Sequence, residues 1–424
     1  MTVHVIGAGI AGLACALTVA EAGRRVVVYE MAGQAGGRCR SFHDPRLDRF
    51  IDTGTHLIIG ANTQVLRYID RLGSRERFTV VAPAAFPFLD LNTAERWILR
   101  PNTGRLPWWL LHPGRRVAGS RLADYLQILR LLWGRKGATV ADCLEGPLMQ
   151  RLWRPLTEAT LNTAPEEASA ALFARVIRDS LMQGEQACRP YLAREGLGPA
   201  LIEPALARIT AAGGQVRFKS RLCALEATKA APSALRLQFE SLTVETEPGD
   251  AVVLALPPWS MAALWPGFPV PAAFRAIVNV HYRLDRPVRL PGQGAFLAVV
   301  GGLAQWLFAR GDVLSVTVSA ADILADQNSA TIAKRVWSDC ATALALPAAP
   351  VPLSRVIKEK RATPAYTPDG ENRLVPISPM PGLFLAGDWT CPDLPATLEA
   401  AITSGLRAAA QVLFSVGTNR IGPC

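Results

Sequence analysis

Three glycines near the start of the chain have the spacing of a turn that binds phosphate groups. Gly7, Gly9 and Gly12 form a G-x-G-x-x-G pattern directly after the apolar run 3–6. The first glycine permits a tight bend, the second lets the backbone approach a pyrophosphate, and the third lets the next helix pack closely on the strand. The start of that helix presents unpaired N–H groups and the positive end of its dipole. We therefore expect a dinucleotide against Gly7, Gly9, Ile10, Ala11 and Gly12.

A carboxylate follows the next predicted strand and completes this pattern. The apolar run 25–29 ends at Glu30, after a helical stretch that closes near Gly23. A carboxylate at this place accepts hydrogen bonds from an adenosine ribose, which favours a 2′-hydroxyl without phosphate. Strand, glycine turn, helix, strand and acid together predict a nucleotide-binding unit, with Glu30 and Met31 beside the adenosine.

A second glycine pair distinguishes between the possible dinucleotides. Gly36-Gly37-Arg38 follows soon after the acid, and the polar segment 52–56 comes next. A nicotinamide enzyme has no need of a second glycine pair at this place. The pattern resembles the extended signature of the flavin amine oxidase and phytoene desaturase superfamily, in which this loop wraps the FAD pyrophosphate and ribityl chain. The resemblance implies FAD against Gly36, Gly37, Arg38, Gly54 and Thr55; the alternative for the glycine pair is an ordinary surface turn with a solvated arginine.

The far end of the chain resembles the other half of such a site. An apolar strand over 382–386 ends in Gly387-Asp388, and an Ala-rich helix follows from about 394. In the superfamily an acid at this place binds a ribityl hydroxyl, and the next helix directs its N-terminus at the flavin pyrimidine, where reduced flavin carries negative charge. Cys391 does not stand where a thioether link is expected, so non-covalent FAD is predicted. The implied contacts are Gly387, Asp388, Thr397, Leu398 and Ala401.

The order of patterns along the chain predicts an α/β protein with a discontinuous Rossmann-like FAD-binding domain of the amine oxidase type. An α+β substrate domain is interleaved with it, helical over 120–182 and rich in strands over 275–318. The resemblance also implies that the backbone at Leu222 contacts the adenine. The predicted FAD-binding segments are 1–80, 196–260 and 352–424, and the predicted substrate-domain segments are 81–195 and 261–351.

Composition agrees with a large globular enzyme of the cytoplasm. The 424 residues are 50% hydrophobic, which suits two domains rather than one simple core. The 8 cysteines include no C-x-x-C pair, so neither a metal site nor a disulfide framework is indicated. The N-terminal apolar run lacks a basic leader, and no apolar run has the ~18 residues of a membrane span. Signal peptide and transmembrane segment are therefore not expected.

The positive charge is concentrated in one segment that also carries tryptophans. Asp124 is its only acid, and the formal net charge of the chain is +10. Apolar positions over 120–133 follow helical spacing, with Arg121, Gln127 and Arg130 on the other side. We expect a membrane-binding helix within 104–137, attracted to an anionic membrane surface on the inner face of the cytoplasmic membrane. The alternative is a core-facing helix with a solvated basic face; nucleic acid is a poorer explanation. The basic residues are Arg100, Arg105, Arg115, Arg116, Arg121, Arg130, Arg135 and Lys136, interleaved with Trp108, Trp109 and Trp133.

Several substrate-domain segments narrow the resemblance to the hydroxysqualene dehydroxylases, the squalene-associated FAD enzymes of bacterial hopanoid pathways. This resemblance covers nearly the whole chain and implies reductive removal of an allylic hydroxyl from hydroxysqualene, which gives squalene. Reduced FAD supplies the hydride, and its electron donor is unknown. The segments are 86–91, 106–109, 159–169, 188–190, 276–281, 310–322 and 358–363.

Loss of the hydroxyl requires an acid beside the flavin. The reacting carbon must lie roughly 3–3.5 Å from the flavin N5, away from bulk water. His56 is the first candidate for the acid because it can titrate near neutrality and its loop resembles the one beside the isoalloxazine. Asp52 would orient it or serve the structure. His281, Asn162 and Glu166 are weaker candidates, each expected to be a structural hydrogen-bonding residue.

Three other functions remain open at this point. A carotenoid-type polyene desaturase or isomerase shares the fold and acts on long polyenes. An amine oxidase would frame its amine with an aromatic pair, and no Trp or Tyr stands directly before the 397–399 segment. A non-enzymatic prenyl-lipid carrier would have no reason to keep Gly7, Gly9 and Gly12 with Glu30 and Asp388.

Overall fold

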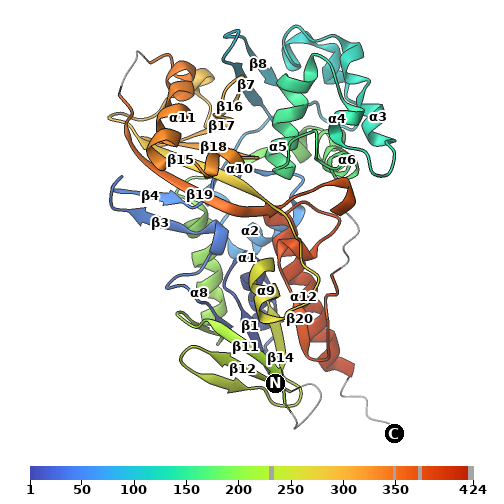
Figure 1. Ribbon diagram of the computed structural model, residues 1–424, viewed down its shortest axis with the longest axis vertical. Helices are drawn as coiled ribbons and strands as arrows, with labels where there is room; N and C mark the ends of the chain where they lie inside the picture. Colours follow the sequence, from blue (N-terminus) through green and yellow to red (C-terminus); the bar gives the residue numbers. More distant parts are fainter. Residues whose placement is uncertain (229–233, 347–349, 371–374, 419–424) are drawn as a thin grey trace.

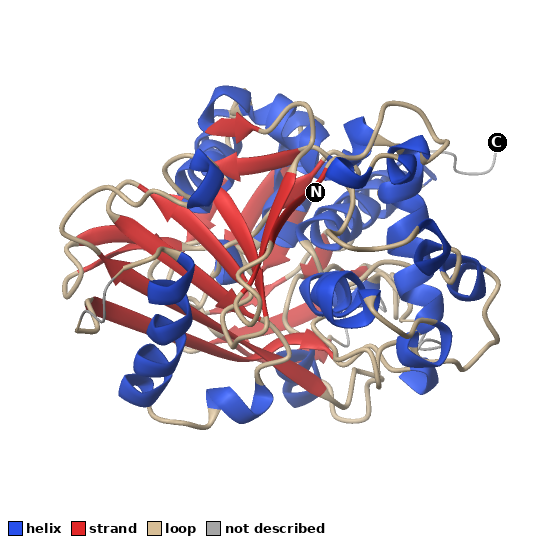
Figure 2. Ribbon diagram, turned by 90° about the horizontal axis from the view of Figure 1, so that it is seen from above, coloured by secondary structure: helices blue, strands red, loops and turns tan. Residues whose placement is uncertain are grey.

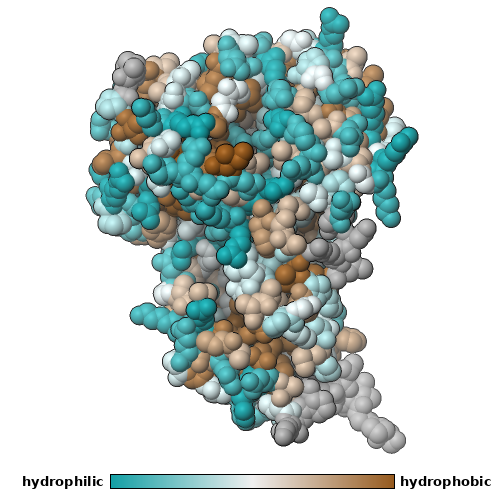
Figure 3. All heavy atoms as spheres, viewed as in Figure 1, coloured by the Kyte–Doolittle hydropathy of each residue, from teal (hydrophilic) through white to brown (hydrophobic). Residues whose placement is uncertain are grey.

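The computed structural model describes residues 1–228, 234–346, 350–370 and 375–418. It consists of two parts stacked along the long axis, with the N-terminus and the end of the last helix in the lower part (Figure 1). The molecule narrows between the two parts (Figure 3). The lower part contains the glycine-rich turns, and strands and helices alternate in it as the sequence predicts, which confirms the α/β class.

The lower part is built on a five-stranded sheet in the order β10-β2-β1-β14-β20. Every pair in it is parallel, and the strands come from segments far apart in the chain. Their carboxyl ends therefore meet at one edge, where open parallel sheets bind ligands. The strands are β1 (Thr2–Ile6), β2 (Arg25–Tyr29), β10 (Gln215–Arg217), β14 (Ala251–Leu254) and β20 (Leu383–Leu385).

Both faces of this sheet are covered, so its central strands are mostly apolar, whereas the edge strand β10 is more polar. One face packs on helices α1 (Ile10–Glu21), α2 (Thr63–Leu72), α8 (Glu203–Ala211) and α12 (Leu398–Thr418). The other face packs on α9 (Pro258–Leu264) and a three-stranded antiparallel sheet. The strands of that small sheet are β11 (Leu222–Ala227), β12 (Leu235–Phe239) and β13 (Thr243–Glu245).

The upper part is built on a seven-stranded sheet in the order β19-β15-β18-β17-β16-β7-β8. This sheet confirms the expected strands over 275–318. It also includes β19, which lies beyond the predicted end of the substrate domain at 351, because β19 pairs along the length of β15. Seen from above, strands cross the molecule with helices on both sides (Figure 2). The strands are β7 (Phe86–Asp90), β8 (Arg96–Leu99), β15 (Phe274–Arg283), β16 (Phe296–Val300), β17 (Trp306–Arg310), β18 (Val313–Val318) and β19 (Leu353–Pro364).

The two faces of the upper sheet differ in chemistry. Alternate residues of β15 and β18, such as Val278 and Val316, pack into a core with α10 (Asp322–Ala325) and α11 (Ser329–Ala343). The residues between them therefore lie on the opposite face. That face is polar on β15 and β18 and aromatic on β7, β16 and β17. Its polar residues are Asn279, His281, Ser315 and Thr317, and its aromatic residues are Phe88, Phe296, Trp306 and Phe308.

Short helices cover the aromatic end of this face. They confirm the helical character expected for 120–182, in shorter pieces than a single periodic pattern suggests. The pieces include α3 (Ile128–Leu132), α4 (Val140–Cys143), α5 (Arg154–Leu161), α6 (Ala170–Asp179) and α7 (Glu185–Cys188).

The segment 120–133 is not the continuous amphipathic helix that its spacing predicts. It folds as a 3-10 turn at Leu122–Tyr125 followed by α3. The backbone bonds of this turn join residues three apart, such as the Leu126 N–H and the Ala123 carbonyl at 3.1 Å, and the Tyr125 hydroxyl ties the turn to the preceding loop by accepting from the Val117 N–H at 3.0 Å. A second difference from the predicted membrane-binding segment concerns its tryptophans: Trp108 is exposed, but Trp109 is buried in the core.

The two parts meet through small elements of the N-terminal segment. The hairpin β3 (Ser41–Asp44) and β4 (Arg49–Asp52) packs on the upper sheet through Ile51 and Val313. A small sheet joins β5 (Ile58–Ile59), β9 (Pro190–Ala193) and β6 (Phe78–Val80). The loop between β4 and β5 therefore lies at the junction, and it contains the predicted residues Gly54, Thr55 and His56.

Candidate functional site at the junction of the two parts

The first glycine turn has the geometry of a phosphate cradle. Gly7 has φ +110°, and a Cβ atom there would lie 2.5 Å from the Ala255 carbonyl oxygen. A Cβ at Gly12 would lie 2.0 Å from the Gly7 carbonyl oxygen. At Gly9, in contrast, a Cβ would meet nothing within 4 Å. Gly7 and Gly12 are thus needed by the fold itself, whereas Gly9 leaves room for a ligand in front of α1, beginning at Ile10 and Ala11.

Glu30 is fixed at the edge of this turn. Its carboxylate accepts hydrogen bonds from the Ala8 N–H at 2.8 Å and from the Ala32 N–H at 2.9 Å. The carboxylate is half-buried, and the neighbouring Met31 is exposed. Two backbone bonds therefore orient Glu30 while oxygen lone pairs remain for a ribose.

The second glycine loop lies directly against the first. The Gly36 N–H donates to the Ala8 carbonyl at 2.9 Å, and Gly9 and Gly36 form a bridge between the two loops. Gly36 and Gly37 both have positive φ, at +114° and +54°. Backbone from both loops thus surrounds the open position at Gly9, as expected for a group with two phosphates.

Arg38 joins the two distant halves of the site. Its guanidinium donates to the Asp388 carboxylate at 2.7 Å and to the Ala362 carbonyl at 2.5 Å. Asp388 is buried, and it lies 350 positions away in the chain. Arg38 is thus partly exposed but held by two partners from the far end of the chain, which favours the cofactor loop over the alternative of a surface turn with a solvated arginine.

The start of α12 is the third wall. Gly387 has φ +145°, and its N–H donates to the Ser404 hydroxyl at 2.9 Å, which ties the turn to α12. Thr397 caps the helix: its hydroxyl accepts from the Ala400 N–H at 3.3 Å and its carbonyl accepts from the Ala401 N–H at 3.0 Å, so the helix begins directly at Leu398. The same wall includes Tyr366, which reaches it from the end of β19.

Tyr366 is a contributor that sequence reasoning missed. Its hydroxyl accepts from the Ala396 N–H at 2.5 Å, one residue before the cap of α12. Burial raises the pKa of this phenol above its ordinary value, so it stays protonated at physiological pH. An aromatic side chain, that of Tyr366, therefore contacts the chain directly before the 397–399 segment, although no aromatic residue directly precedes that segment in the sequence.

His56 lies half-buried in the loop beside this junction. Burial lowers the pKa of its imidazole below the ordinary value of 6.5, and the positive charge of Arg38 lowers it further, against the opposing effects of Asp52 and Asp388. His56 is therefore near both members of the Arg38 and Asp388 pair. Its imidazole is largely neutral at pH 7 and becomes an acid only at lower pH.

Gly54 separates His56 from the polar face of the upper sheet. A Cβ at Gly54 would lie 3.4 Å from the Asn279 Nδ2 atom and 3.8 Å from the His56 Nε2 atom. Asn279 is bonded through its Oδ1 atom to the Thr317 hydroxyl at 2.8 Å. The loop and the sheet thus bring the His56 Nε2 and Asn279 Nδ2 atoms close to Gly54, which is one of the predicted cofactor contacts with Thr55.

The other acid and base candidates have structural partners. Asp52 accepts from the Leu197 N–H at 2.9 Å and from the Arg310 guanidinium at 2.8 Å. Asn162 bonds to the Ala320 N–H at 2.7 Å, and Glu166 pairs with Arg154. These three residues hold loops and strands in place, as expected for structural hydrogen-bonding residues.

His281 is also structural. It is fully buried, its Nδ1 atom lies 2.8 Å from the Ser315 hydroxyl, and burial lowers its pKa to about 4. Its neutral imidazole belongs to the packed sheet. It is not placed with the Gly54 and His56 group.

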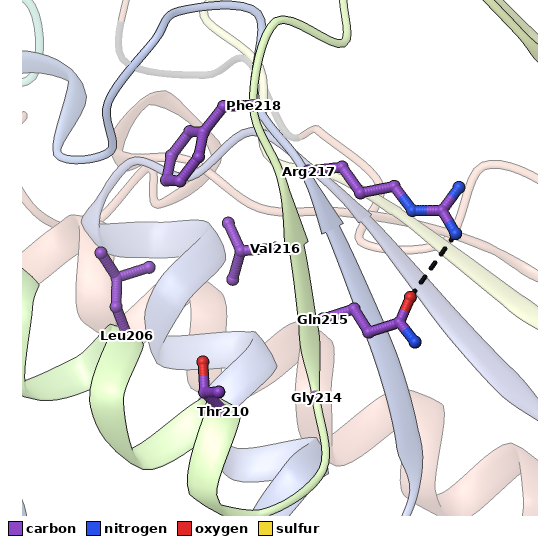
Figure 4. A pocket seen from close by; sticks show the side chains of 7 residues that line it. All are labelled: Leu206, Thr210, Gly214, Gln215, Val216, Arg217 and Phe218. Atoms are coloured by element: carbon purple, nitrogen blue, oxygen red, sulfur yellow. Dashed lines mark hydrogen bonds between the residues drawn. The ribbon is translucent and has the colours of Figure 1, made fainter.

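Two further observations delimit the site. A hollow between α8 and β10 is lined by Leu206, Val216 and Phe218, while Gln215 and Arg217 point to the other side of the strand (Figure 4). None of the predicted cofactor residues lines this hollow. Within the described residues, no group of three or more His, Cys, Asp or Glu side chains is arranged to hold a metal ion.

Leu222 is the remaining predicted contact. It begins β11 and packs partly buried against the second core of the lower part, opposite Phe239. Its backbone lies in the same lower part as Glu30. Its place beside an adenine remains a prediction.

Comparison with known proteins agrees with this geometry. The family model of flavin-containing amine oxidoreductases matches residues 10–413. A hydroxysqualene dehydroxylase of Sinorhizobium fredii is 42% identical over 420 residues, 98% of this chain and 99% of that protein. One of Rhodopseudomonas palustris is 42% identical over 417 residues, 97% and 98% of the two chains. The structure of a protein titled putative protoporphyrinogen oxidase from Exiguobacterium shares the fold, with a TM-score of 0.70 and 16% identity over 98% of this chain and 99% of that chain.

The matches extend across both parts of the molecule and include both halves of the candidate site. The identity to the curated relatives is well above that needed to establish a family, and the structural neighbour shows the same arrangement of the chain at low identity. The chain is a flavin-dependent oxidoreductase that belongs to the flavin-containing amine oxidoreductases and, among them, to the hydroxysqualene dehydroxylases.

Proposed function

We propose that the protein reductively removes the hydroxyl group of hydroxysqualene, with FAD as cofactor, to give squalene and water in hopanoid biosynthesis. The observation that carries this proposal is the junction itself: the loop at Thr53 and Gly54 is bonded to the Arg38 carbonyl of the cofactor loop and touches Asn279, on a sheet face that is polar at one end and aromatic at the other. Reduced FAD supplies the hydride in this reaction. The residues of the chain bind the cofactor, orient the substrate and supply a proton.

The residues present fit FAD. Gly9 leaves room for the pyrophosphate, Glu30 is oriented for the adenosine ribose, and Asp388 is held by Arg38 beside the ribityl position. The start of α12 offers N–H groups to the flavin pyrimidine. Cys391 is buried with its Sγ atom 3.4 Å from the Ala400 carbonyl, which supports non-covalent binding.

The aromatic face suits the hydrocarbon chains of the substrate. Phe296 and Trp306 lie beside Phe88 on neighbouring strands, and short helices cover them from outside. A face of this kind binds polyprenyl chains by excluding water. It also keeps bulk water from the allylic cation that forms when the carbon–oxygen bond breaks.

His56 is the proposed proton donor. The carbon–oxygen bond breaks with its electron pair on oxygen, the proton completes a water molecule, and the carbon takes the hydride. His56 lies beside the Arg38 and Asp388 pair and faces the space next to Gly54. Because its pKa is lowered, donation by the imidazolium form is favoured at acidic pH.

An exposed apolar surface around α3 supports peripheral binding to an anionic membrane on its cytoplasmic side. Leu106 and Trp133 are 80% and 78% exposed, and the Arg115 guanidinium lies 5.3 Å from the centre of the Trp108 ring. Exposed apolar residues bordered by cations are typical of interfacial binding. The surface residues are Leu106, Trp108, Leu111, Leu122, Leu126, Leu129 and Trp133, and the exposed cations beside them are Arg105, Arg121, Arg130, Arg135 and Lys136.

This surface lies outside the helices that cover the aromatic face. A hydrocarbon substrate could pass from the bilayer beneath these helices to the junction. None of the described helices combines the length and the apolar character that crossing a bilayer requires. The electron donor that reduces the flavin is left open by this proposal.

Product analysis under two conditions tests the proposed reaction. Anaerobic protein with photoreduced flavin should convert hydroxysqualene to squalene, whereas protein with oxidised flavin should not. A polyene desaturase would instead act with oxidised flavin and lengthen the conjugation of its substrate. Formation of additional conjugated double bonds, with hydroxysqualene left unchanged, would contradict the proposal, and purification without bound flavin would favour a prenyl-lipid carrier.

A further inference from the structure

A polar row crosses the upper sheet where it meets the cofactor loop. Asn279 on β15 is paired in register with Thr317 on β18, and Thr317 is paired with Trp306 on β17. Asn279 is 3% exposed, and Thr317 is half-buried. This row therefore links the Gly54 loop to the aromatic end of the same face.

The carboxamide of Asn279 is oriented by its partners. Its Oδ1 atom accepts from the Thr317 hydroxyl at 2.8 Å, which leaves the Nδ2 atom toward the loop, 3.5 Å from the Thr53 carbonyl. A carboxamide nitrogen has two N–H groups, and Thr53 uses at most one of them. Among the described residues no second acceptor is bonded to Nδ2, so one N–H group is available to a ligand.

The available N–H group faces the same space as His56. A Cβ at Gly54 would contact both the Asn279 Nδ2 atom and the His56 Nε2 atom, at 3.4 and 3.8 Å, so the two nitrogens border the same position beside Gly54. The charges of Arg38 and Asp388, which join the cofactor halves, act on His56. The Asn279 and His56 nitrogens therefore lie next to the cofactor site and at the polar end of the aromatic face.

We infer that Asn279 is a catalytic residue that donates a hydrogen bond to the hydroxyl oxygen of the substrate, with Thr317 as its positioning residue. The inference rests on the proposed function. As the carbon–oxygen bond breaks, its electron pair moves to oxygen, and a fixed N–H donor stabilises that charge. His56 or water would supply the proton that completes the departing water molecule, and the hydride that replaces the hydroxyl on carbon would be the contribution of the bound cofactor. Asn279 thus discriminates the alcohol substrate from the hydrocarbon product.

Binding to the oxidised holoprotein tests this role without turnover. Hydroxysqualene should bind more tightly than squalene to the natural protein. Asn279→Leu keeps the size of the side chain but removes the donor, so the ratio of the two dissociation constants should fall about 3- to 10-fold. Dehydroxylation by the reduced variant should fall on the order of 100-fold. Flavin content and reoxidation by dioxygen should stay near natural values.

Variants of Thr317 supply the matched comparison. Thr317→Val removes the hydroxyl that orients the carboxamide and should lower both the binding ratio and the dehydroxylation rate, whereas Thr317→Ser should restore them. Ser315→Ala changes the same sheet face through its bond to His281 and should leave the binding ratio unchanged. Thermal melting of each holoprotein reports any loss of folding.

The possible outcomes separate the two proposals. If the natural protein neither binds nor converts hydroxysqualene, the proposed function is wrong. If it does both, and Asn279→Leu keeps the natural ratio and rate, the role of Asn279 is wrong. If Asn279→Leu fails to fold, the Thr317 variants decide. Equal binding ratios and equal dehydroxylation rates for Thr317→Val and Thr317→Ser would overturn the inference. A loss of both quantities in Thr317→Val alone would support it.

Discussion

At the residue scale, the site depends on a few side chains whose roles differ although their positions are close. Arg38 and Asp388 hold the two cofactor halves together, while His56 stands beside them with a lowered pKa. Asp52, a carboxylate in the same loop region, is bonded to Arg310 and Leu197 and serves the junction instead. Two polar residues of the same loop region, His56 and Asp52, therefore differ in their partners: His56 lies beside the Arg38 and Asp388 pair, whereas Asp52 holds neighbouring segments together.

Replacement of His56 tests proton donation. His56→Ala should retain flavin but lose reoxidation by hydroxysqualene by about 10²–10⁴-fold. Because the imidazole must be protonated to act and its pKa is lowered, the natural single-turnover rate should rise as pH falls below 6.5, and this rise should vanish in the variant. Stopped-flow absorbance of the flavin measures both effects.

Reoxidation by dioxygen is the control for this variant, because it requires no carbon–oxygen cleavage. It should proceed at the natural rate in His56→Ala. A variant that forms squalene at the natural rate at every pH would place the acid elsewhere.

Replacement of Gly9 tests the phosphate cradle. Gly9→Val places a side chain in the space that no protein atom occupies within 4 Å, so the protein should fold but purify largely without flavin. Gly33 provides a better control than Gly23: a Cβ at either position would meet nothing within 4 Å, but Gly23 has φ +72°, which would strain a valine. Gly33→Val should purify yellow; full flavin content in Gly9→Val would contradict the cradle.

At the element scale, hydrophobic spacing predicted the central strands well and the helices of the upper part poorly. The runs at 3–6, 25–29 and 383–385 are strands because both faces of a parallel sheet are buried. The stripe over 120–133 has helical spacing, yet it folds as a 3-10 turn, tied to Val117 by the Tyr125 hydroxyl, followed by α3. A tertiary bond of this kind leaves no trace in the periodicity.

Because tertiary contacts leave no trace in local sequence patterns, only some of the site residues could be predicted. Gly9 and Glu30 stand in a local pattern that carries its own geometry, and Asp388 stands in one that resembles a known superfamily, so the sequence could indicate them as cofactor contacts. Asn279 and Thr317 meet only because β15 and β18 pair in one particular register, and Tyr366 reaches α12 from β19. Strand register and long-range contacts are set by the fold, so a single sequence did not reveal them.

The exposed apolar surface around α3 yields a prediction for this element. Charge reversal of Arg105, Arg121 and Arg135 should weaken binding to anionic vesicles by up to about 1 kcal/mol per charge at low salt, and less at high salt. Trp133→Ser should weaken binding at both salt concentrations, because its ring is 78% exposed and apolar. Vesicle co-sedimentation measures both effects.

Ile323 provides the matched control for that experiment. It is 84% exposed but lies on α10, away from this surface. Ile323→Ser should bind vesicles like the natural protein. Failure of the natural protein to bind anionic vesicles would show that the surface around α3 is not a membrane contact.

At the scale of the whole molecule, buried histidines couple stability to pH. His281 has a folded-state pKa of about 4 against an ordinary value of 6.5, so the unfolded chain binds more protons below pH 6.5. Its contribution is therefore lost as pH falls from 6.5 to about 4, by an upper limit of about 3 kcal/mol. Denaturant unfolding of His281→Gln should show a shallower loss of stability over this window than the natural protein.

His43 serves as the control, since it lies on β3 with 46% of its side chain exposed. His43→Gln should follow the natural dependence of stability on pH. Identical slopes for His281→Gln and the natural protein would mean that His281 does not titrate as its burial requires.

The central claim is that electrons held by the flavin are delivered to the carbon that carries the hydroxyl group. A single turnover tests it most directly: anaerobic, fully reduced holoprotein is mixed with excess hydroxysqualene, and flavin absorbance and squalene are followed together. We predict that squalene appears at the rate of flavin reoxidation, with one molecule formed for each flavin oxidised. Squalene formed without flavin reoxidation, or flavin reoxidised without squalene, would contradict the account.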